Sequence, residues 1–475
     1  MMQNKARAYD LAVIGAGASG LFTCALIELI CAGKLEQALE RAYVEADLLK
    51  AWQPVLAKAS FYQDLSIVLI EGQAKAGKKL CLTGGGRCNL ASNLSGLELL
   101  KQYHEAFNFL RPTWSYFSPN LLRSLLFSMG ISTYWDEKGR LYPVSNSAKS
   151  VRDQLLAYAS QNPNLAIVYQ TQIQAIKPLA EANSITNEPN AFRLKSANNE
   201  FVAKRVILAS GGFSVPNTGS NGELANALAK LADFNCTLVE PKAALAPLIW
   251  QGQAKFPLSN LAGISLHDVK LTLQVKATTE AKRQYLRRFG RELVHASSGD
   301  LLITKQGLSG PVALNISRFF TAQLANELTV EFLSEANLAS LKQATNEKLK
   351  AKSAETLAKV WQQVCPLPAR LLDYLWTAAP NYPKRSLKVF TETDLAEAYK
   401  IFTWSCNNFV VAPLQKATAT CGGIALTELD PKSLALKAMP NCYVVGELMN
   451  VDANCGGFNL LHAFASSSLV VRALV

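Results

Sequence analysis

The sequence predicts an α/β fold in which one sheet domain is built from both ends of the chain and is interrupted by inserted segments. Residues 9–33 parse as a strand, a glycine-rich turn and a helix. Short continuous apolar runs, which are typical of central parallel strands, recur at 66–70, 206–209 and 442–446. The segments between these runs have other periodicities, which indicates that separate domains are inserted into the sheet domain.

The inserted middle of the chain has two parts. Alternating segments at 242–332 have the period of two that antiparallel strands show, and 335–396 is rich in Ala, Leu, Lys and Glu at helical spacing. The expected domains are the sheet domain at 1–240 and 414–475 with a helical insertion at about 34–64, a barrel-like antiparallel insert at 241–333 and 397–413, and a helical domain at 334–396.

Composition limits the class of protein. Of 475 residues, 49% are hydrophobic and 18% are charged, so the chain is globular and too long for one core. The net charge of +12 favours an anionic partner such as nucleic acid, a phosphorylated cofactor or an acidic membrane surface, although a merely basic protein fits the charge equally well. Ten cysteines without zinc-type or disulfide-framework spacing indicate reduced thiols in a cytoplasmic protein and no metal site.

The apolar stretch 11–33 carries a single charge, Glu28, over 23 residues, which is long enough to cross a bilayer. Glycines interrupt its first half, and no cleavage site typical of a signal peptide stands out. We therefore interpret the stretch as a buried strand, turn and helix, and we expect no membrane association.

The turn in this stretch, Gly15-Ala-Gly17-Ala-Ser-Gly20, has the G-x-G-x-x-G pattern of a dinucleotide site. Its glycines allow a tight turn, close approach of the backbone to a pyrophosphate, and close packing of the helix on the strand. The N-terminus of the helix would offer oriented N–H groups and partial positive charge to the phosphates. The pattern is weak alone, but the strand before it and the helix after it match the context that such a site requires.

Glu71 closes the second predicted strand, where a dinucleotide site places an acidic residue for the ribose hydroxyls. It lies 51 residues beyond Gly20 rather than the usual ~20. An insertion at 34–64 accounts for the excess. The alternative is that Glu71 is a solvated strand end.

The stretch "CLTGGGRCNLAS" follows the second strand by a few residues, so we expect it at the carboxyl edge of the sheet, where ligands bind. Three consecutive glycines would free backbone N–H groups for a phosphate or a ring edge. Arg87 would add fixed charge, and Cys88 a thiol that can act as a weak acid. The competing interpretation is an ordinary glycine turn with a buried cysteine.

Eight stretches run in the order of one known family over nearly the whole chain: "VIGAGASGL", "GKKLCLTGGGRCNLASN", "DEKGRLYPVSNSAKSV", "ILASGGFSVPNTGSNG", "LAGISLHDVKL", "LLITKQGLSGP", "ATATCGGI" and "YVVGELMNVDANCGGFNLLHAFASS". With them the chain resembles the BaiN/YhiN-like family of bacterial FAD-dependent oxidoreductases, within the flavoproteins that have two dinucleotide-binding domains. The chain departs from the family pattern at Asn221, at 430–437 and in the insertion at 34–64.

The resemblance implies a tightly held FAD, not NAD, in a Rossmann-like FAD-binding domain. The pyrophosphate would lie at the first glycine turn, the adenosine ribose at Glu71, and the flavin pyrimidine at the N-terminus of the last helix, which favours the anionic reduced ring. The implied cofactor-binding residues are Gly15, Gly17, Ala18, Ser19, Gly20, Glu71, Lys79, Gly84, Gly85, Arg87, Asn89, Gly211, Gly212, Gly446, Glu447, Asp452, Gly456, Gly457 and Phe458.

The resemblance also implies reduction of an activated carbon–carbon double bond, either in a uridine of large-subunit (23S) ribosomal RNA or in a steroid enone of bile acids. In both reactions hydride adds to the carbon β to a carbonyl, and an acid protonates the α carbon. We expect NADPH or NADH to reduce the flavin. The candidate catalytic residues are Cys88 as the acid and Arg87, or alternatively a backbone N–H, as the group that polarises the carbonyl.

A basic segment at 276–291 favours RNA as the substrate. Its cations would follow phosphates, and Tyr285 and Phe289 would stack on unpaired bases, whereas the alternative is a solvated hairpin. The predicted RNA-binding residues are Lys282, Arg283, Arg287, Arg288 and Arg291. The rival functions are a small-molecule enone reductase and a non-catalytic, flavin-containing RNA-binding factor.

Overall fold

The computed structural model describes residues 7–42, 46–179, 191–229, 236–276, 279–289, 293–320 and 325–475. The chain divides into two compact units: residues 1–242 with 418–475 form unit 1, and residues 243–417 form unit 2. The helical segment that we expected as a domain of its own belongs to unit 2 together with the antiparallel insert.

Unit 1 is built on a sheet of eight strands in which β19, β20, β9, β1, β2 and β6 follow one another, while β7 and β8 extend from β9. Four pairs are parallel: β20 with β9, β9 with β1, β1 with β2, and β2 with β6. The strands are β1 (Arg7–Ile14), β2 (Ile67–Ile70), β6 (Leu165–Val168), β7 (Ile173–Pro178), β8 (Phe192–Ser196), β9 (Glu200–Leu208), β19 (Ala435–Leu436) and β20 (Met439–Val444). All of β2 and the last four residues of β1 are buried, as expected of central strands.

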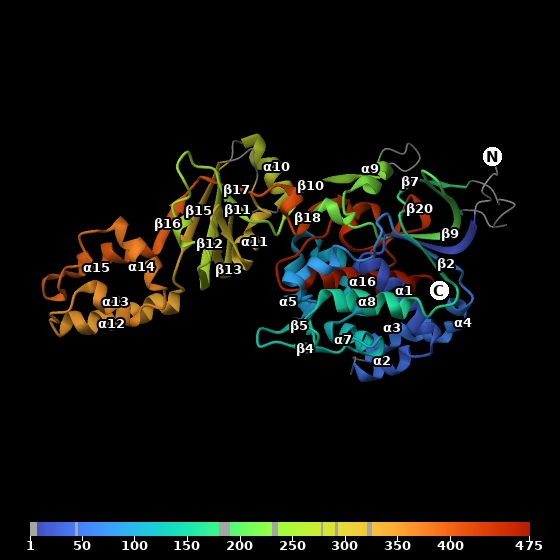
Figure 1. Ribbon diagram of the computed structural model, residues 1–475, viewed down its shortest axis with the longest axis horizontal. Coiled ribbons are helices and arrows are strands. Elements are labelled where there is room, and N and C mark those ends of the chain that lie inside the picture. The colour runs from blue at the N-terminus through green and yellow to red at the C-terminus, as the bar shows by residue number, and fades with distance from the viewer. Residues whose placement is uncertain are drawn as a thin grey trace. The chain divides into compact units, whose positions relative to one another are not determined.

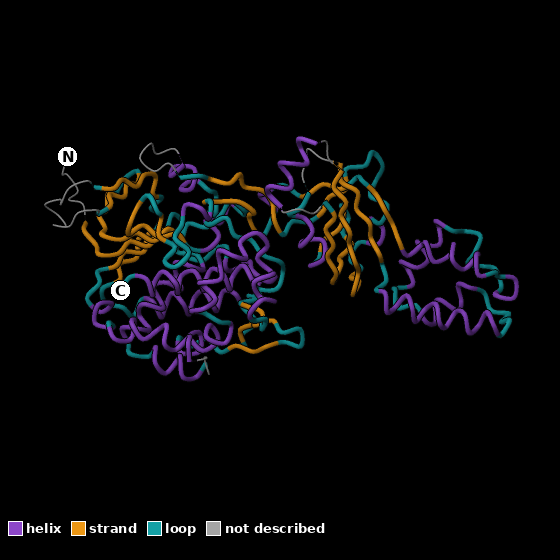
Figure 2. Tube along the Cα trace, turned by 180° about the vertical axis from the view of Figure 1, so that it is seen from behind, coloured by secondary structure: helices purple, strands orange, loops and turns teal. Residues whose placement is uncertain are grey.

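The helices of unit 1 pack beside this sheet (Figures 1 and 2), with α1 against both α8 and α16. The helices are α1 (Ala18–Cys31), α2 (Leu35–Arg41), α3 (Ala46–Ala57), α4 (Ala59–Gln63), α5 (Gly96–Leu100), α6 (Phe107–Tyr116), α7 (Pro119–Ser128), α8 (Ala148–Ala159), α9 (Glu223–Ala229) and α16 (Phe458–Ala473). The helices α2 to α4 occupy the segment between the first helix and the second strand. That segment accounts for the distance from Gly20 to Glu71.

Two small sheets complete unit 1. One has the order β3 (Ala91–Ser92), β5 (Arg140–Pro143) and β4 (Thr133–Trp135), and its pairs are antiparallel. The other pairs β10 (Leu238–Ala244) with β18 (Ala419–Ile424), at the places where the chain leaves and re-enters the unit.

Unit 2 contains a seven-stranded sheet in which all six pairs are antiparallel. Its order is β16 (Thr403–Cys406), β15 (Ala325–Glu331), β12 (Ser265–Lys276), β13 (Val294–Ile303), β14 (Gly307–Ser309), β11 (Leu248–Trp250) and β17 (Phe409–Val411). Its helices are α10 (Thr279–Phe289), α11 (Pro311–Ser317), α12 (Glu335–Lys350), α13 (Leu357–Val364), α14 (Ala369–Leu375) and α15 (Glu392–Tyr399). The parallel sheet of unit 1 and the antiparallel insert confirm the predicted α/β fold class.

Among the described residues, no single helix is long and apolar enough to cross a membrane. One bent pair, α1 with α2, passes a test of length and composition, but its two helices meet at 104°.

Candidate functional site

Four parallel strands of unit 1 end at one level of the sheet. Ile14 of β1 pairs with Ile70 of β2 and with Leu208 of β9, and Leu208 pairs with Val444 of β20. The first predicted site residues after these four ends are Gly15, Glu71, Gly211 and Gly446. The topology therefore brings segments that are far apart in sequence to one carboxyl edge, where ligands of such sheets bind.

The first glycine turn has a different environment at each of its glycines. Gly15 has a φ of 104°, and a Cβ there would lie 2.5 Å from the Ala209 carbonyl oxygen. A Cβ on Gly20 would lie 1.9 Å from the Gly15 carbonyl oxygen, so this position packs the helix tightly on the turn. Gly17 caps α1 and faces open space, because a Cβ there would have no described atom within 4 Å. The open side of the turn is therefore at the helix N-terminus, where N–H groups are free to meet an anion.

Glu71 is buried and is bonded to the same turn. Its Oε2 accepts the Ala16 N–H at 2.7 Å, and its Oε1 accepts the Gln73 N–H at 2.8 Å. Burial raises the pKa of this carboxyl, while the two backbone N–H groups lower it. Glu71 is thus not a solvated strand end, which was the alternative left open by the sequence.

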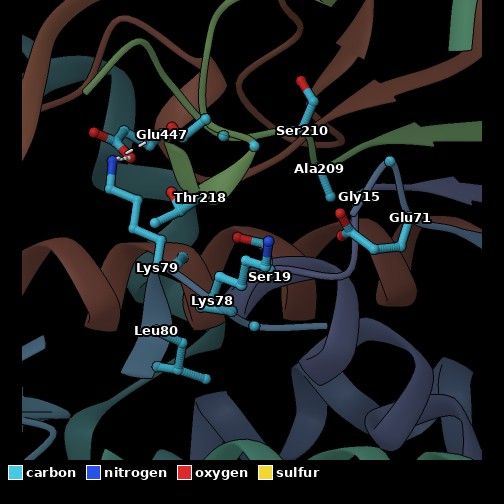
Figure 3. A pocket seen from close by; sticks show the side chains of 18 of the residues that line it. Gly15, Ser19, Glu71, Lys78, Lys79, Leu80, Ala209, Ser210, Thr218 and Glu447 are labelled. Atoms are coloured by element: carbon cyan, nitrogen blue, oxygen red, sulfur yellow. Dashed lines mark hydrogen bonds and ion pairs between the residues drawn. The ribbon is translucent and has the colours of Figure 1, made fainter. Parts of the chain in front are cut away.

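A pocket lies at this edge of unit 1. In Figure 3, Gly15 and Glu71 lie on one side of it, and Lys79 and Glu447 lie on the other. The predicted cofactor-binding residues that line it are Gly15, Gly17, Ala18, Ser19, Glu71, Lys79, Gly211 and Glu447. The other predicted ones lie outside its lining: Gly20, Gly84, Gly85, Arg87, Asn89, Gly212, Gly446, Asp452, Gly456, Gly457 and Phe458.

A polar cluster forms the Lys79 side of the pocket. The Lys79 Nζ pairs with Glu447 Oε2 at 2.5 Å and donates to Ser214 Oγ at 2.6 Å. Glu447 Oε1 accepts the Thr420 N–H at 2.9 Å and the Ser214 hydroxyl at 3.1 Å. Both charged side chains are about one-fifth exposed. The cluster joins the loops after β2 and β9 to β18 and to the loop after β20.

Serine and threonine hydroxyls in this cluster were not predicted. Thr420 Oγ1 accepts the N–H groups of Phe213 and Ser214 at 2.9 and 3.1 Å. Ser220 Oγ lies 3.4 Å from Lys79 Nζ. These residues occur within stretches that carry the family resemblance, but no spacing in the sequence connects them to one another.

Two predicted glycines are required by close packing near this cluster. A Cβ on Gly212 would lie 2.7 Å from Thr420 Oγ1 and 2.9 Å from the carboxyl carbon of Glu447. Gly446 has a φ of 65°, and a Cβ there would meet the Ser19 hydroxyl. Neither glycine lines the pocket, but each allows close packing against residues at this edge of the sheet.

The triple-glycine loop contains consecutive left-handed residues. Gly84, Gly85 and Gly86 have φ values of 57°, 65° and 88°, and Cys88 has a φ of 64°. Cys88 is fully buried, and burial raises the pKa of its thiol to about 12. The position of Cys88 in the core favours the packing interpretation over an acid that reaches the pocket.

The same loop contacts the start of the last helix. With its amide oriented to satisfy both groups, Asn89 accepts the Gly457 N–H at 3.2 Å and donates to the Ala91 carbonyl at 3.1 Å. Gly457 caps α16 with a φ of 90°, and a Cβ there would lie 2.7 Å from the Ala91 nitrogen. Phe458, which follows Gly457, and Asp452 are also buried. Two predicted site segments, 84–89 and 456–458, are therefore in contact.

His462 is a lining residue that the sequence analysis missed. It lies in the second turn of α16 and is buried, with its ring 6.1 Å from that of Tyr103 in an edge-to-face arrangement. Burial lowers its pKa to about 4, so the imidazole is neutral at physiological pH. A lone histidine in an apolar run gives no signal in the sequence that separates a site residue from a core residue.

The basic segment of unit 2 is a helix, α10, and not a hairpin. The expectation that its aromatic residues stack on bases is wrong, because Tyr285 and Phe289 are buried. The Tyr285 hydroxyl lies 2.9 Å from His295 Nε2 and donates to the Phe319 carbonyl at 3.0 Å. The two aromatics are four residues apart and so lie on one face of the helix, which packs inward.

The predicted RNA-binding residues differ in their exposure. Lys282 and Arg283 are exposed and Arg288 is half-buried. The Arg287 side chain and the whole of Arg291 lie outside the described part of the chain. Among the described residues, no group of three or more His, Cys, Asp or Glu side chains could hold a metal ion.

The family described as HI0933-like protein Rossmann domain matches residues 55–473. The chain belongs to this family. It is thereby a member of a family of flavin-dependent oxidoreductases with a Rossmann-like FAD-binding domain, and the resemblance stated from the sequence is confirmed.

Two curated relatives align over most of the chain. The 3-dehydro-bile acid delta(4,6)-reductase of Clostridium scindens is 28% identical over 88% of this chain and 95% of its own. The ribosomal RNA dihydrouridine synthase of Escherichia coli K12 is 25% identical over 98% of both chains. Among solved structures, a quinol-fumarate reductase with menaquinol aligns over 99% of this chain and 71% of its own, with 11% identity and a TM-score of 0.44.

Proposed function

We propose that this chain is an FAD-dependent reductase that converts a uridine of large-subunit (23S) ribosomal RNA to dihydrouridine, with NADPH or NADH as the electron donor. The observation that carries the proposal is the alignment, over 98% of both chains, with a relative named ribosomal RNA dihydrouridine synthase. The net charge of +12 supports a polyanionic substrate over a sterol.

The pocket residues fit a dinucleotide. Gly17 leaves open space at the N-terminus of α1, whereas Gly15 and Gly20 are tightly packed behind it. A pyrophosphate at the open position would meet the N–H groups of the first turn of α1 and its partial positive charge. Ser19 and Lys79 also line the pocket and would add a hydroxyl and a cation.

Glu71 would hold the adenosine ribose. Each of its carboxylate oxygens already accepts one backbone N–H, from Ala16 or Gln73. A carboxylate oxygen has two lone pairs, so each oxygen retains one for a ribose hydroxyl. The two backbone bonds thereby fix the carboxylate for this role.

A bound FAD would supply a ring that takes hydride from NAD(P)H and gives it to an electron-poor double bond. The N-terminus of α16 would place its partial positive charge near the pyrimidine part of that ring. Asn89 holds this N-terminus by accepting the Gly457 N–H. In the uridine, C6 would receive the hydride and C5 a proton, after the base has left its stack.

Replacement of Cys88 by Ala tests the two interpretations of the thiol. A packing role predicts a loss of about 1 kcal/mol in the free energy of unfolding with turnover per bound flavin unchanged. The acid role predicts that turnover collapses while the spectrum of bound flavin is unaltered. The fully buried side chain makes the first outcome the expected one.

The deciding experiment maps dihydrouridine in ribosomal RNA from cells with and without this gene, and on ribosomal RNA treated with the purified protein and NADPH. Loss of one dihydrouridine in the deletion, and its restoration in vitro, is the expected result. An unchanged map would reject the RNA substrate. Reduction of a steroid enone by the same preparation would then establish the second candidate, which the relative of 28% identity favours.

A further inference from the structure

An exposed aromatic–arginine patch lies beside the triple-glycine loop. The guanidinium carbon of Arg87 lies 5.0 Å from the centroid of the Tyr142 ring. The ring of Tyr134 lies 6.2 Å from that of Tyr142 and is tilted by 33°. Tyr142 is buried, but Arg87 is exposed and Tyr134 is 38% exposed. We call Arg87, Tyr134 and Tyr142 the Arg87 patch.

The fold determines why these residues meet. The triple-glycine loop leads into β3, and Ala91 of β3 pairs with Leu141 of β5. Tyr134 of β4 pairs directly with Tyr142 of β5, so both side chains lie on one face of the small sheet. The hairpin of β4 and β5 extends outward from the helices of unit 1 in both views (Figures 1 and 2).

The charge at the patch is carried by Arg87. The neighbouring Arg140 is paired with Asp136 at 2.6 Å, so its charge is compensated. Arg87 has no ion-pair partner among the described residues, and its guanidinium lies over the ring of Tyr142. Two large apolar side chains close to the patch in the chain, Leu82 and Val144, are also strongly exposed, at 57% and 60%.

We propose that the Arg87 patch binds an unpaired nucleotide of single-stranded RNA, with the base stacked on Tyr134 and the phosphate paired with Arg87. This inference rests on the proposed function. An exposed ring beside an uncompensated guanidinium is the combination by which proteins bind unpaired nucleotides. The aromatics of α10 cannot serve in this way, because they are buried.

From the position of the patch we infer that the nucleotide bound there is a neighbour of the target uridine in the RNA strand. Asn89, two residues after Arg87, is bonded to the N-terminus of α16, where the flavin pyrimidine is proposed to lie. The patch therefore borders the proposed redox site without lining the pocket. A strand anchored here would present a neighbouring extruded base to that site.

The test measures binding of a fluorescein-labelled oligouridylate, about 12 nucleotides long, to the FAD-loaded full chain by fluorescence anisotropy. Tyr134→Ala is expected to weaken binding about tenfold, the loss of one stacked base, and Tyr134→Phe to bind like the unmodified chain. The matched control is Phe127→Ala, which removes a 52% exposed ring that also has an arginine, Arg41, 4.5 Å from its centroid. Unchanged flavin content and melting temperature would show that each variant is folded.

The outcomes separate this inference from the proposed function. If Tyr134→Ala binds the oligouridylate as tightly as the unmodified chain, or if Phe127→Ala loses as much affinity as Tyr134→Ala, the patch is rejected. Neither result bears on the proposed formation of dihydrouridine. If the unmodified chain does not bind the oligouridylate and forms no dihydrouridine, both proposals fail. Selective loss in Tyr134→Ala together with retention in Tyr134→Phe supports the patch.

Discussion

In the first turn, protein atoms block the position of a Cβ at Gly15 and Gly20 but leave it open at Gly17. Substitutions at these glycines can therefore separate an effect on folding from an effect on ligand binding. Gly20→Ala would place a methyl group 1.9 Å from the Gly15 carbonyl oxygen, so we expect a loss of about 3 kcal/mol in the free energy of unfolding.

The methyl group of Gly17→Ala would contact no described atom, so the FAD-free variant should melt like the FAD-free unmodified protein. It should nevertheless lose at least about tenfold in FAD affinity, because the methyl would occupy the approach of the pyrophosphate. Thermal melts with FAD titrations check both; equal FAD affinity in Gly17→Ala would contradict the placement.

We expect His462 to make the free energy of unfolding depend on pH. Its folded-state pKa of about 4 lies below the ordinary 6.5, so the folded state excludes a proton that the unfolded chain accepts. The stability from the neutral ring is present above pH 6.5 and is lost as the pH falls through 4, by up to about 3 kcal/mol.

Denaturant melts at several pH values check this. In His462→Leu the free energy of unfolding should decline less between pH 7 and pH 4 than in the unmodified chain. This is the pH range between the ordinary pKa of histidine and the lowered pKa of His462. His267→Gln is the control, because that side chain is 74% exposed. Parallel curves for His462→Leu and the unmodified chain would refute the assignment.

At the scale of elements, the Lys79–Glu447 pair joins loops that the parallel strands bring to one edge. A double-mutant cycle with Lys79→Met and Glu447→Gln should give a coupling of about 1 kcal/mol, because both groups are mostly buried and share Ser214. The exposed pair Lys101–Glu98 is the control and should couple by less than about 0.5 kcal/mol. Equal coupling energies in the two pairs would show that the cluster contributes nothing beyond a surface ion pair.

Several elements of the parallel sheet, although not β6, could be predicted because apolar runs and glycine turns are local signals. The turn at Gly15–Gly20 leads into α1 as predicted, and β2 lies within the predicted run 66–70, whereas β9 (Glu200–Leu208) begins well before the predicted run 206–209. The polar cluster could not be predicted, because Ser214 and Thr420 meet only through the topology. Local periodicity cannot reveal a contact between loops that follow different strands.

The charged segment shows a signal that was present but misinterpreted. Tyr285 and Phe289 are four residues apart, which is the spacing of one face of a helix. Their burial follows from that period, whereas the predicted base stacking followed from composition alone. Conversely, the pairing of Tyr134 with Tyr142 depends on a hairpin register that composition does not specify.

For the whole molecule, the pocket lies within unit 1 although that unit comes from two separate stretches of chain. Residues 1–242 supply the first glycine turn and Glu71, and residues 418–475 supply Glu447 and α16. Every lining residue of the pocket belongs to unit 1. The pocket that we propose for FAD is therefore formed by unit 1 alone.

The most direct test of this account is the stoichiometry of FAD on the purified full chain, measured from the flavin absorbance after saturation with FAD and removal of the free cofactor. We expect one FAD per chain for the unmodified protein and a greatly reduced occupancy for Gly17→Ala, while the FAD-free forms of both proteins should melt at the same temperature. A folded, unmodified chain that retains no FAD after saturation would contradict it.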